Sequence, residues 1–371
     1  MHDVAIIGGG LAGLVNAIHL ARSGVGVVLF EQHDYPRNKV CGEYISNEVL
    51  PYLRSLDLDP APLHPKAIRR FLMSAPSGRA VQATLPLGGF SVRRFTLDAH
   101  WYEAALRAGV EFHLHTPIAA VQFEEQAFSL TTRQGDSFRA RVVIGSYGKR
   151  SLLDRVLHRR FFQEKAAYVG VKAYYAYDFP EDLVALHHFP GGYCGLSQVE
   201  NGLVNVAYLT TEDRLQQHGS LDQLEQHALA VNPHLRDLLE KGARITPKPW
   251  VISNVSFRSK ALIEDHILMS GDAAGMIPPV AGNGMAMAIQ SARISASLTL
   301  DFLTGRISRA QLEQKYQQQW NNAFRNRLFW GRHIQRLVGT TLGAEIAAGG
   351  LIMMPGILPV IIKQTHGDFR L

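Results

Sequence analysis

The sequence predicts an α/β protein with a Rossmann-type domain that carries an inserted β-meander, an α+β domain with a mostly antiparallel sheet, and a C-terminal helical region. Three observations predict this fold. The chain opens on a Val/Ile-rich run, a glycine turn and an Ala/Leu-rich segment of helical period. A second apolar run ends in a Gly-Asp pair at residues 271–272. Between them, short β-branched and aromatic runs alternate with turn residues.

The opening segment has the order strand, glycine turn, helix, strand and acid, which is typical of a dinucleotide site. Gly8 permits the sharp turn, Gly10 lets the backbone approach a pyrophosphate, and Gly13 lets the helix pack closely on the strand. The N-terminus of the helix then presents free N–H groups to the phosphates. Glu31 ends the second strand and can accept hydrogen bonds from both hydroxyls of an adenosine ribose. The predicted contacts are Gly8, Gly10, Leu11, Ala12, Gly13, Glu31 and Gln32.

The loop after Glu31 leaves the second strand near the expected ribose site. Its cations Arg37 and Lys39 can meet the pyrophosphate, and Cys41 and Gly42 follow directly. A buried cysteine is more often a small apolar filler than a reagent, so a catalytic Cys41 is the less common alternative. The residues from 45 to 56 predict a helix that is capped near its start.

The segment 91–98 leads into a predicted helix over residues 99–109, with Asp98 as its N-cap. Arg94 lies just before that helix. We expect it either to contact a phosphate or the adenine, or to form a surface salt bridge.

Strand patterns fill residues 67–87 and 110–140, and the second of these regions indicates the inserted meander. Residues 140–145 then form a strand that should rejoin the parallel sheet, and Gly148 lies in the glycine turn after it, close to the cofactor.

Strands dominate the second domain, where Asn201-Gly202 is the strongest local signal for a hairpin turn. Strand alternation puts Tyr193 and Gly195 on one face and Cys194 on the other, and one of these faces would form the floor of a substrate cavity. The predicted cavity residues are Tyr44, Tyr193, Cys194, Gly195 and Pro279. The predicted domains are residues 1–66, 92–165 and 263–300 for cofactor binding, residues 67–91 and 166–262 for the substrate, and residues 301–371 for the C-terminal helices and an apolar tail.

The second glycine-rich segment follows an apolar strand and opens a helix near Gly284. Small residues let the backbone approach a flat ring, and Asp272 can hydrogen-bond a ribityl hydroxyl. Free N–H groups at the new helix start can stabilise negative charge on a reduced flavin. A turn with a purely structural aspartate is the alternative. The predicted contacts here are Gly271, Asp272, Gly282, Asn283, Gly284 and Met285.

Composition narrows the function classes. The 371 residues are 46% hydrophobic with a net charge of +6, which fits a globular protein without a nucleic-acid motif. The two cysteines imply no disulfide framework, and we expect a cytoplasmic protein without a metal site. The apolar stretch 349–362 is too short to span a bilayer, but it could rest on one or cap a cavity. Arginines between residues 325 and 336 form either a solvated helix face or a docking surface.

Together, the two glycine-rich segments resemble the FAD-binding fold of the superfamily of aromatic hydroxylases, flavin-dependent halogenases and geranylgeranyl reductases. The resemblance spans nearly the whole chain and implies FAD as the cofactor. It places Glu31 on the AMP half, Arg94 in an Arg-x-x-x-Asp segment near the cofactor, and residues 271–272 in the Gly-Asp motif. Residues 39–42 resemble the corresponding segment of geranylgeranyl reductases. Residues 282–285 instead resemble the corresponding segment of oxidoreductases and monooxygenases found beside type III polyketide synthases.

Two departures from this pattern bear on the activity. Hydroxylases carry an Asp-Gly pair where this chain has Tyr147-Gly148, which leaves the mode of nicotinamide use open. The paired tryptophans of halogenases are absent, which argues against halogenation.

The resemblance favours an FAD-dependent monooxygenase that hydroxylates an apolar aromatic or polyketide-type substrate through a flavin C4a-hydroperoxide, with NAD(P)H as a candidate external reductant. One alternative is a reductase of prenyl double bonds, in which Cys41 or a bound water supplies the proton. Another is an electron-transfer flavoprotein that docks through its Arg-rich C-terminal segment. The expected partner is an apolar small molecule, either free or carrier-bound. Peripheral membrane contact and the oligomeric state stay open.

Overall fold

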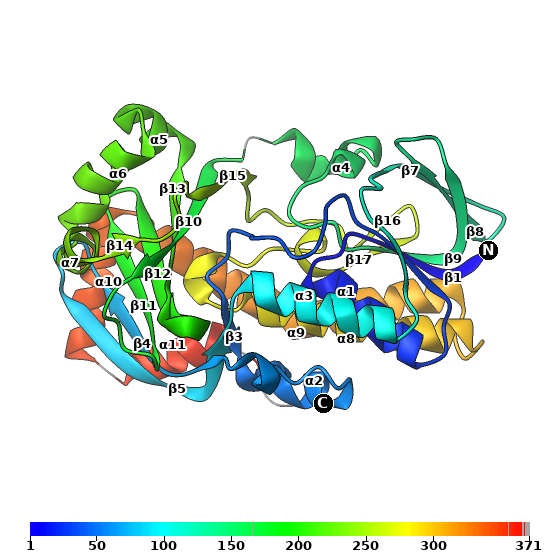
Figure 1. The fold of residues 1–371 in the computed structure, drawn as a ribbon, viewed down its shortest axis with the longest axis horizontal. Helices are drawn as coiled ribbons and strands as arrows, with labels where there is room; N and C mark the ends of the chain where they lie inside the picture. Colours follow the sequence, from blue (N-terminus) through cyan, green and yellow to red (C-terminus); the bar gives the residue numbers. More distant parts are fainter. Residues whose placement is uncertain (165, 355, 366, 368–371) are drawn as a thin grey trace.

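The computed structural model describes residues 1–164, 166–354, 356–365 and 367, and these residues form two sheets at opposite ends of the long axis (Figure 1). We call them the Rossmann sheet and the large sheet. The final residues of the predicted 301–371 region, from 368 on, lie outside this description.

The Rossmann sheet has the strand order β16-β17-β9-β1-β2-β6, with β8 and β7 extending from β9 as an antiparallel meander. The strands from β17 to β6 pair in parallel, as the sequence predicts. Helices α1, α3 and α8 pack together on this domain. The strand bounds are β1 His2–Ile7, β2 Val27–Phe30, β6 Glu111–His113, β7 Ile118–Glu124, β8 Ala127–Thr132, β9 Ser137–Gly145, β16 Ile263–Glu264 and β17 Ile267–Met269.

The large sheet has the order β14-β10-β13-β12-β11-β4-β5-β3, and β15 pairs with β10. It is antiparallel except where β11 runs parallel to β4. The predicted hairpin turn joins β12 to β13, where Asn201 and Gly202 have φ of 64° and 71°. The bounds are β3 Tyr44–Ser46, β4 Lys66–Ser74, β5 Ala80–Ser91, β10 Tyr168–Ala176, β11 Leu183–Phe189, β12 Gly192–Gln198, β13 Val204–Thr211, β14 Ala243–Arg244 and β15 Trp250–Val255. Strand β3 belongs to this sheet, although we assigned its residues to the first domain.

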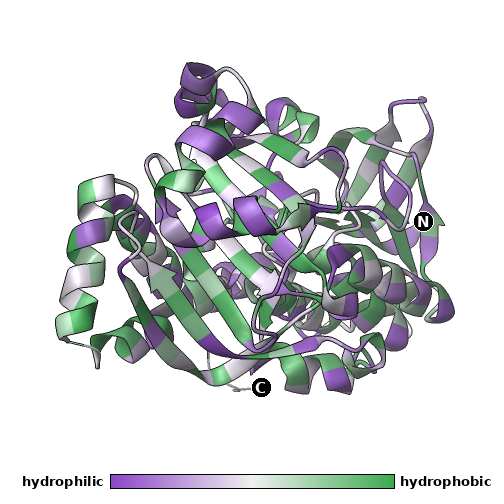
Figure 2. Ribbon diagram, turned by 60° about the vertical axis from the view of Figure 1, so that its left-hand side comes forward, coloured by the Kyte–Doolittle hydropathy of each residue, from purple (hydrophilic) through white to green (hydrophobic). Residues whose placement is uncertain are grey.

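Helices cover one face of the large sheet, and in Figure 2 they are mostly purple while the strands beneath are mostly green. The helical stretch over residues 221–241 is divided in two, because Asn232 caps a new helix that has Pro233 in its first turn. The other face of the sheet points toward the Rossmann domain. The covering helices are α5 Glu212–His218, α6 Leu221–His227 and α7 Pro233–Lys241, with the 3₁₀ turn η5 Leu229–Val231.

Two predicted helix starts are wrong. Helix α3 (Arg94–Arg107) begins at Arg94 rather than after Asp98, because the Glu43 carboxylate accepts a hydrogen bond from the Arg94 N–H at 2.7 Å and caps the helix from outside. Asp98 is therefore buried in the first turns instead of acting as the N-cap. The helix predicted over residues 45–56 is only α2 (Leu50–Ser55), after strand β3 and a 3₁₀ turn that Ser46 caps.

The remaining helices run along the Rossmann domain and then fold back on the large sheet. Helices α10 and α11 pack on both α9 and β5. No helix in the described ranges is long and apolar enough to cross a membrane. The bounds are α1 Leu11–Arg22, α4 Leu152–Val156, α8 Gly284–Leu303, α9 Arg309–Val338, α10 Thr341–Met353 and α11 Ile357–Thr365, with 3₁₀ turns η1 Asn47–Val49, η2 Ala61–Leu63, η3 Arg160–Gln163, η4 Glu200–Gly202, η6 Gly271–Ala273 and η7 Pro279–Ala281.

Candidate functional site

A cavity of about 920 Å³ lies between the Rossmann domain and the large sheet. It begins at the glycine turn after β1, passes the Gly-Asp pair at 271–272, and continues to helices α10 and α11. Among the residues that the sequence assigned to the cofactor, those that line this cavity are Gly8, Gly10, Leu11, Ala12, Glu31, Gln32, Arg37, Lys39, Cys41, Gly42, Arg94, Gly148, Gly271, Asp272, Gly282, Asn283, Gly284 and Met285.

The first glycine turn has the geometry that a dinucleotide requires. A Cβ on Gly13 would lie 1.9 Å from the Gly8 carbonyl oxygen, so Gly13 lies behind the cavity and serves helix packing. Gly10 faces open space, which leaves room for a pyrophosphate. The Glu31 carboxylate accepts hydrogen bonds from the backbone N–H groups of Gly9 at 2.8 Å and His33 at 3.1 Å. These bonds hold the carboxylate at the cavity wall.

Ser146 gives a direct test of whether a polar cofactor fits here. Its hydroxyl is buried, lines the cavity, and finds no hydrogen-bond partner among the described residues. Buried polar groups in proteins are normally paired, so this oxygen fits a site that a polar ligand completes. The residues present therefore fit FAD.

Arg94, Lys39 and Asp98 form a buried ionic cluster beside the cavity. Arg94 donates two hydrogen bonds of 2.8 Å to the Asp98 carboxylate, and Lys39 donates a third of 2.7 Å. Burial alone would raise the pKa of Asp98, but the two cations hold it below its ordinary value. Two cations share one carboxylate, so the cluster keeps net positive charge at the cavity wall, where it can attract a pyrophosphate. The surface salt bridge that we considered for Arg94 is instead a buried one.

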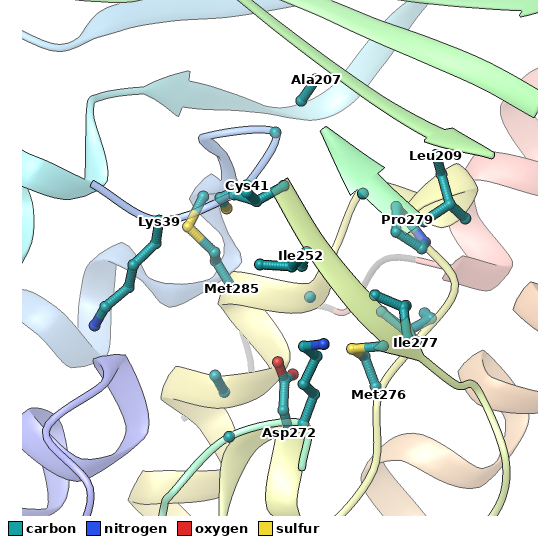
Figure 3. A pocket seen from close by; sticks show the side chains of 18 of the residues that line it. Lys39, Cys41, Ala207, Leu209, Ile252, Asp272, Met276, Ile277, Pro279 and Met285 are labelled. Carbon is teal, nitrogen blue, oxygen red and sulfur yellow. The ribbon is translucent and has the colours of Figure 1, made fainter. Parts of the chain in front are cut away.

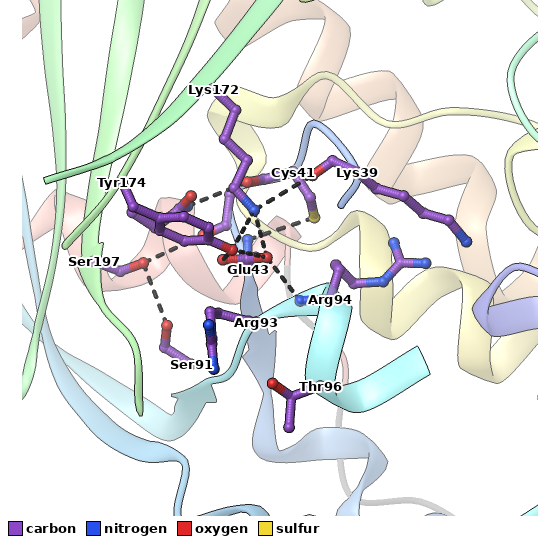
Figure 4. A network of polar contacts seen from close by, with 12 residues as sticks. Lys39, Cys41, Glu43, Ser91, Arg93, Arg94, Thr96, Lys172, Tyr174 and Ser197 are labelled. Atoms are coloured by element: carbon purple, nitrogen blue, oxygen red, sulfur yellow. Dashed lines mark hydrogen bonds and ion pairs between the residues drawn. The ribbon is translucent and has the colours of Figure 1, made fainter. Parts of the chain in front are cut away.

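The large sheet holds the loop that carries Cys41 and Gly42. Side chains from three of its strands donate hydrogen bonds to three carbonyl groups of the loop, as Lys172 and Ser197 do in Figure 4. The pairs are Lys172 to Lys39 at 3.3 Å, Asn205 to Cys41 at 3.2 Å and Ser197 to Gly42 at 3.3 Å. The loop position therefore depends on the second domain.

Glu43 anchors the end of the same loop. Its carboxylate accepts hydrogen bonds from Lys172 Nζ at 2.5 Å and from the Tyr174 hydroxyl at 2.9 Å (Figure 4). Burial raises the pKa of Glu43, whereas the Lys172 ammonium opposes that shift. We did not predict Glu43, Lys172 or Tyr174. The signal was a lysine in the otherwise apolar and aromatic run 168–177, where an ionised side chain needs a buried partner.

Cys41 itself lines the cavity, and burial raises the pKa of its thiol. The Glu43 N–H donates to its sulfur at 3.4 Å. In Figure 3, Cys41 lies across the cavity from Asp272 and close to Met285. The thiol is therefore a neutral, protonated group at the cofactor cavity.

The second glycine-rich segment lies opposite the first. A Cβ on Gly271, which has φ of +65°, would lie 2.8 Å from the Ala12 Cβ, so the two segments pack tightly. Lys260 Nζ donates 2.7 Å hydrogen bonds to the carbonyl oxygens of Asp272 and Lys149, and burial lowers the pKa of Lys260 to about 8. No described side chain caps the start of α8 at Gly284. These groups can hold a ribityl chain and a flavin edge.

The predicted substrate residues Tyr44, Tyr193, Gly195 and Pro279 line the cavity. Cys194 does not: it is completely buried in the core between the large sheet and its covering helices. Strand alternation puts Cys194 on the face opposite Tyr193, and that face packs against helices. The Tyr193 hydroxyl accepts a 3.2 Å hydrogen bond from the Val280 N–H and so holds the Pro279 loop in place.

At its end near the C-terminal helices, the cavity forms an apolar arm between these helices and the large sheet. Residues that line this arm also belong to a hydrophobic cluster of β4, β5, α10 and α11. The arm is lined by Phe71, Met73, Leu85, Val184, Leu351, Leu358, Ile361 and Ile362. A long apolar molecule can extend along it.

Three curated relatives resemble most of this chain. Conditioned medium factor receptor 1 of Dictyostelium discoideum is 26% identical over 87% of this chain and 68% of its own length. Menaquinone reductase of Mycobacterium tuberculosis is 26% identical over 80% of this chain and 76% of its own. Digeranylgeranylglycerophospholipid reductase 2 of Methanopyrus kandleri is 25% identical over 87% of this chain and 83% of its own.

Two solved structures share the fold. The flavin-dependent halogenase CmlS is 19% identical with a TM-score of 0.79, over 91% of this chain and 64% of its own. A geranylgeranyl bacteriochlorophyll reductase-like protein from Thermoplasma acidophilum is 20% identical with a TM-score of 0.78, over 98% of this chain and 96% of its own. The sequence profile of the FAD binding domain family matches residues 1–323. With the glycine turns, Glu31 and the Gly-Asp pair arranged around one cavity, this chain belongs to the FAD binding domain family and is an FAD-dependent oxidoreductase.

Proposed function

We propose that this oxidoreductase reduces isolated carbon–carbon double bonds in a long, apolar, isoprenoid-like substrate. The observation that carries the proposal is the extent of the cavity, which includes both the neutral thiol of Cys41 and the apolar arm. The names of the menaquinone and digeranylgeranylglycerophospholipid reductases among the relatives support the same class of reaction.

Saturation of a double bond requires a hydride on one carbon and a proton on the other. Bound FAD, once reduced, supplies the hydride. Cys41 supplies the proton, because its raised pKa keeps the thiol protonated at neutral pH, and it regains the proton from solvent. The hydrogen bonds from Lys172 and Asn205 to the loop carbonyls fix the thiol in the cavity. We propose NAD(P)H as the external two-electron donor.

The monooxygenase that the sequence favours is the competing proposal. The apolar arm of the cavity serves it equally well. However, Cys41, Met276 and Met285 all line the cavity, and thiols and thioethers are readily oxidised by oxygen-transferring species. This arrangement of sulfur atoms favours the reductase.

An assay without oxygen separates the two activities. The dithionite-reduced, FAD-loaded protein is incubated anaerobically with geranylgeraniol, a polyprenyl alcohol, and the product is analysed by mass spectrometry. A gain of two hydrogens per reacted double bond supports the proposal. If product forms only in air and contains an oxygen atom from labelled dioxygen, the enzyme is a monooxygenase.

A further inference from the structure

The C-terminal helices expose many apolar side chains on the side that faces away from the large sheet. On α10, Leu342 is 70% exposed, Ile346 is 62% exposed and Met353 is 85% exposed. Buried residues of the same helix, such as Ala348, pack toward β5 instead. The C-terminal apolar surface comprises Phe329, Trp330, Leu337, Leu342, Ile346, Ile352, Met353, Met354, Ile357 and Val360. Apolar surfaces of this kind on globular proteins commonly mark contact sites for a protein or a membrane.

One wall of the substrate cavity is formed by the helices that carry this surface. Leu337 lines the cavity and is also 54% exposed to solvent. Ala347 and Leu351 of α10 and Ile361 of α11 line the cavity from the inner side of the same helices. One group of helices therefore presents apolar side chains both to the cavity and to the exterior.

The charged residues of this stretch are mostly basic. Residues 314–364 contain a single acid, Glu345, and its carboxylate is bound by Arg79 and Ser77. Arg325, Arg336 and Lys363 are exposed. The basic residues of this stretch are Lys315, Arg325, Arg327, Arg332, Arg336 and Lys363.

Aromatic residues are interleaved with these cations on α9. Phe329 and Trp330 are half exposed and in edge-to-face contact, with Arg325 one helical turn before Phe329. Helices that lie in the interfacial region of a bilayer typically expose tryptophan, phenylalanine and arginine side by side, next to an uncharged apolar face.

We propose that the C-terminal apolar surface rests on an anionic lipid bilayer, so that an apolar substrate enters the cavity beside Leu337 directly from the acyl-chain region. The entry route rests on the proposed function, whereas the docking does not. A second copy of this chain suits the surface less well. A two-fold contact would bring Arg325, Arg336 and Lys363 of both copies together, and the single acid of residues 314–364 already binds Arg79.

Flotation with lipid vesicles tests the docking. The full-length, FAD-loaded protein is mixed with vesicles of phosphatidylglycerol and phosphatidylcholine, or of phosphatidylcholine alone. We expect it to float with the anionic vesicles, to float less with the neutral ones, and to dissociate as the salt concentration rises.

Charge variants locate the contact. Leu342→Glu combined with Ile346→Glu should weaken anionic vesicle binding by at least about tenfold, because two carboxylates would enter an apolar, negatively charged interface. Arg336→Ser should weaken it by about fivefold. The matched control is Leu106→Glu combined with Val156→Glu, at exposed apolar positions of the Rossmann domain, and it should bind like the unaltered protein. Flavin absorbance checks that each variant retains its fold.

Three results would overturn the docking: no vesicle binding, equal binding by the Leu342/Ile346 variant, or light scattering that shows a dimer which this variant splits. Failure of the proposed reductase is distinguishable from these results. If the protein floats with vesicles but reduces no polyprenyl substrate, the proposed function is wrong and the proposed membrane docking stands. If the protein reduces a detergent-dispersed substrate but never floats with vesicles, only the proposed membrane docking is wrong.

Discussion

Lys172 and Glu43 form a completely buried ion pair, with the Lys172 Nζ 2.5 Å from the Glu43 carboxylate. One partner lies in the middle of strand β10 of the large sheet, and the other ends the loop that carries Cys41. Because burial opposes the ionised form of each group, the two charges persist only as a pair. This pair connects the stability of the second domain to the geometry of the flavin site.

Replacement of Lys172 should be severely destabilising. Lys172→Met leaves the Glu43 carboxylate buried without its cation, which typically costs about 3–5 kcal/mol of unfolding free energy. The double variant Lys172→Met with Glu43→Gln should recover most of this loss, because no unpaired charge remains. Urea unfolding measures both. Equal stability of the single and double variants would contradict the pairing.

Loss of the Glu31 carboxylate charge should weaken FAD binding. Glu31→Gln weakens hydrogen bonds from the ribose hydroxyls, and bonds to a charged group contribute about 1.5–3 kcal/mol, or roughly 10- to 100-fold in affinity. Isothermal titration of the apoprotein with FAD measures the change. Glu124→Gln, at an exposed position of β7, is the matched control and should leave affinity unchanged.

Cys41 should matter for the chemical step more than for cofactor binding. Cys41→Ala should lower the turnover rate about 100-fold or more, the usual contribution of a positioned acid, while FAD affinity stays within a few fold. Cys41→Ser should recover little, because a hydroxyl is a much weaker acid than a thiol. If Cys41→Ala and the unaltered enzyme have equal turnover rates at saturating substrate, water and not Cys41 supplies the proton to the double bond.

Stability should fall in mild acid. Burial lowers the pKa of His187 to about 3 and that of His188 to about 4, against an ordinary value of 6.5. Below pH 6.5 the unfolded chain therefore binds protons that the folded protein does not, and stability decreases as the pH falls toward 4. Two such groups make the unfolding free energy fall by up to about 2.7 kcal/mol for each unit by which the pH is lowered. Urea unfolding at several pH values measures the slope.

In the unaltered protein, Ser74 Oγ lies 2.8 Å from His187 Nδ1. His187→Asn keeps a polar partner for this hydroxyl but removes one titrating group, so it should roughly halve the dependence of the unfolding free energy on pH. An unchanged slope would show that other groups cause the acid sensitivity.

The parts of the fold that the sequence predicts are those whose causes are local. The turn at Gly8, the acid at Glu31 and the pair Gly271-Asp272 each follow from a strand, a turn and a helix that are neighbours in the chain. The family assignment follows from them. The Asn201-Gly202 turn is predictable for the same reason, since its residue types favour positive φ.

The parts of the fold and the site that the sequence does not predict depend on contacts between segments that are far apart in the chain. Helix α3 begins early because Glu43, fifty-one residues before Arg94, supplies its cap. Alternation separates Tyr193 from Cys194, but only the packing of α6 and α7 decides which of the two faces the cavity. The Lys172–Glu43 pair spans 129 residues. A lysine in an apolar run indicates that it has a buried partner, but no local pattern identifies that partner as Glu43. Long-range pairing of this kind is fixed by the topology of the large sheet.

Hydride transfer from the reduced enzyme to a polyprenyl double bond should need no oxygen. The most direct measurement is an anaerobic single turnover, in which oxidised-flavin absorbance is followed after geranylgeraniol is mixed with the stoichiometrically reduced enzyme. We expect the oxidised spectrum to return at the rate at which saturated product forms, with one double bond reduced per flavin. A flavin that stays reduced until air is admitted, and then yields an oxygenated product, would contradict it.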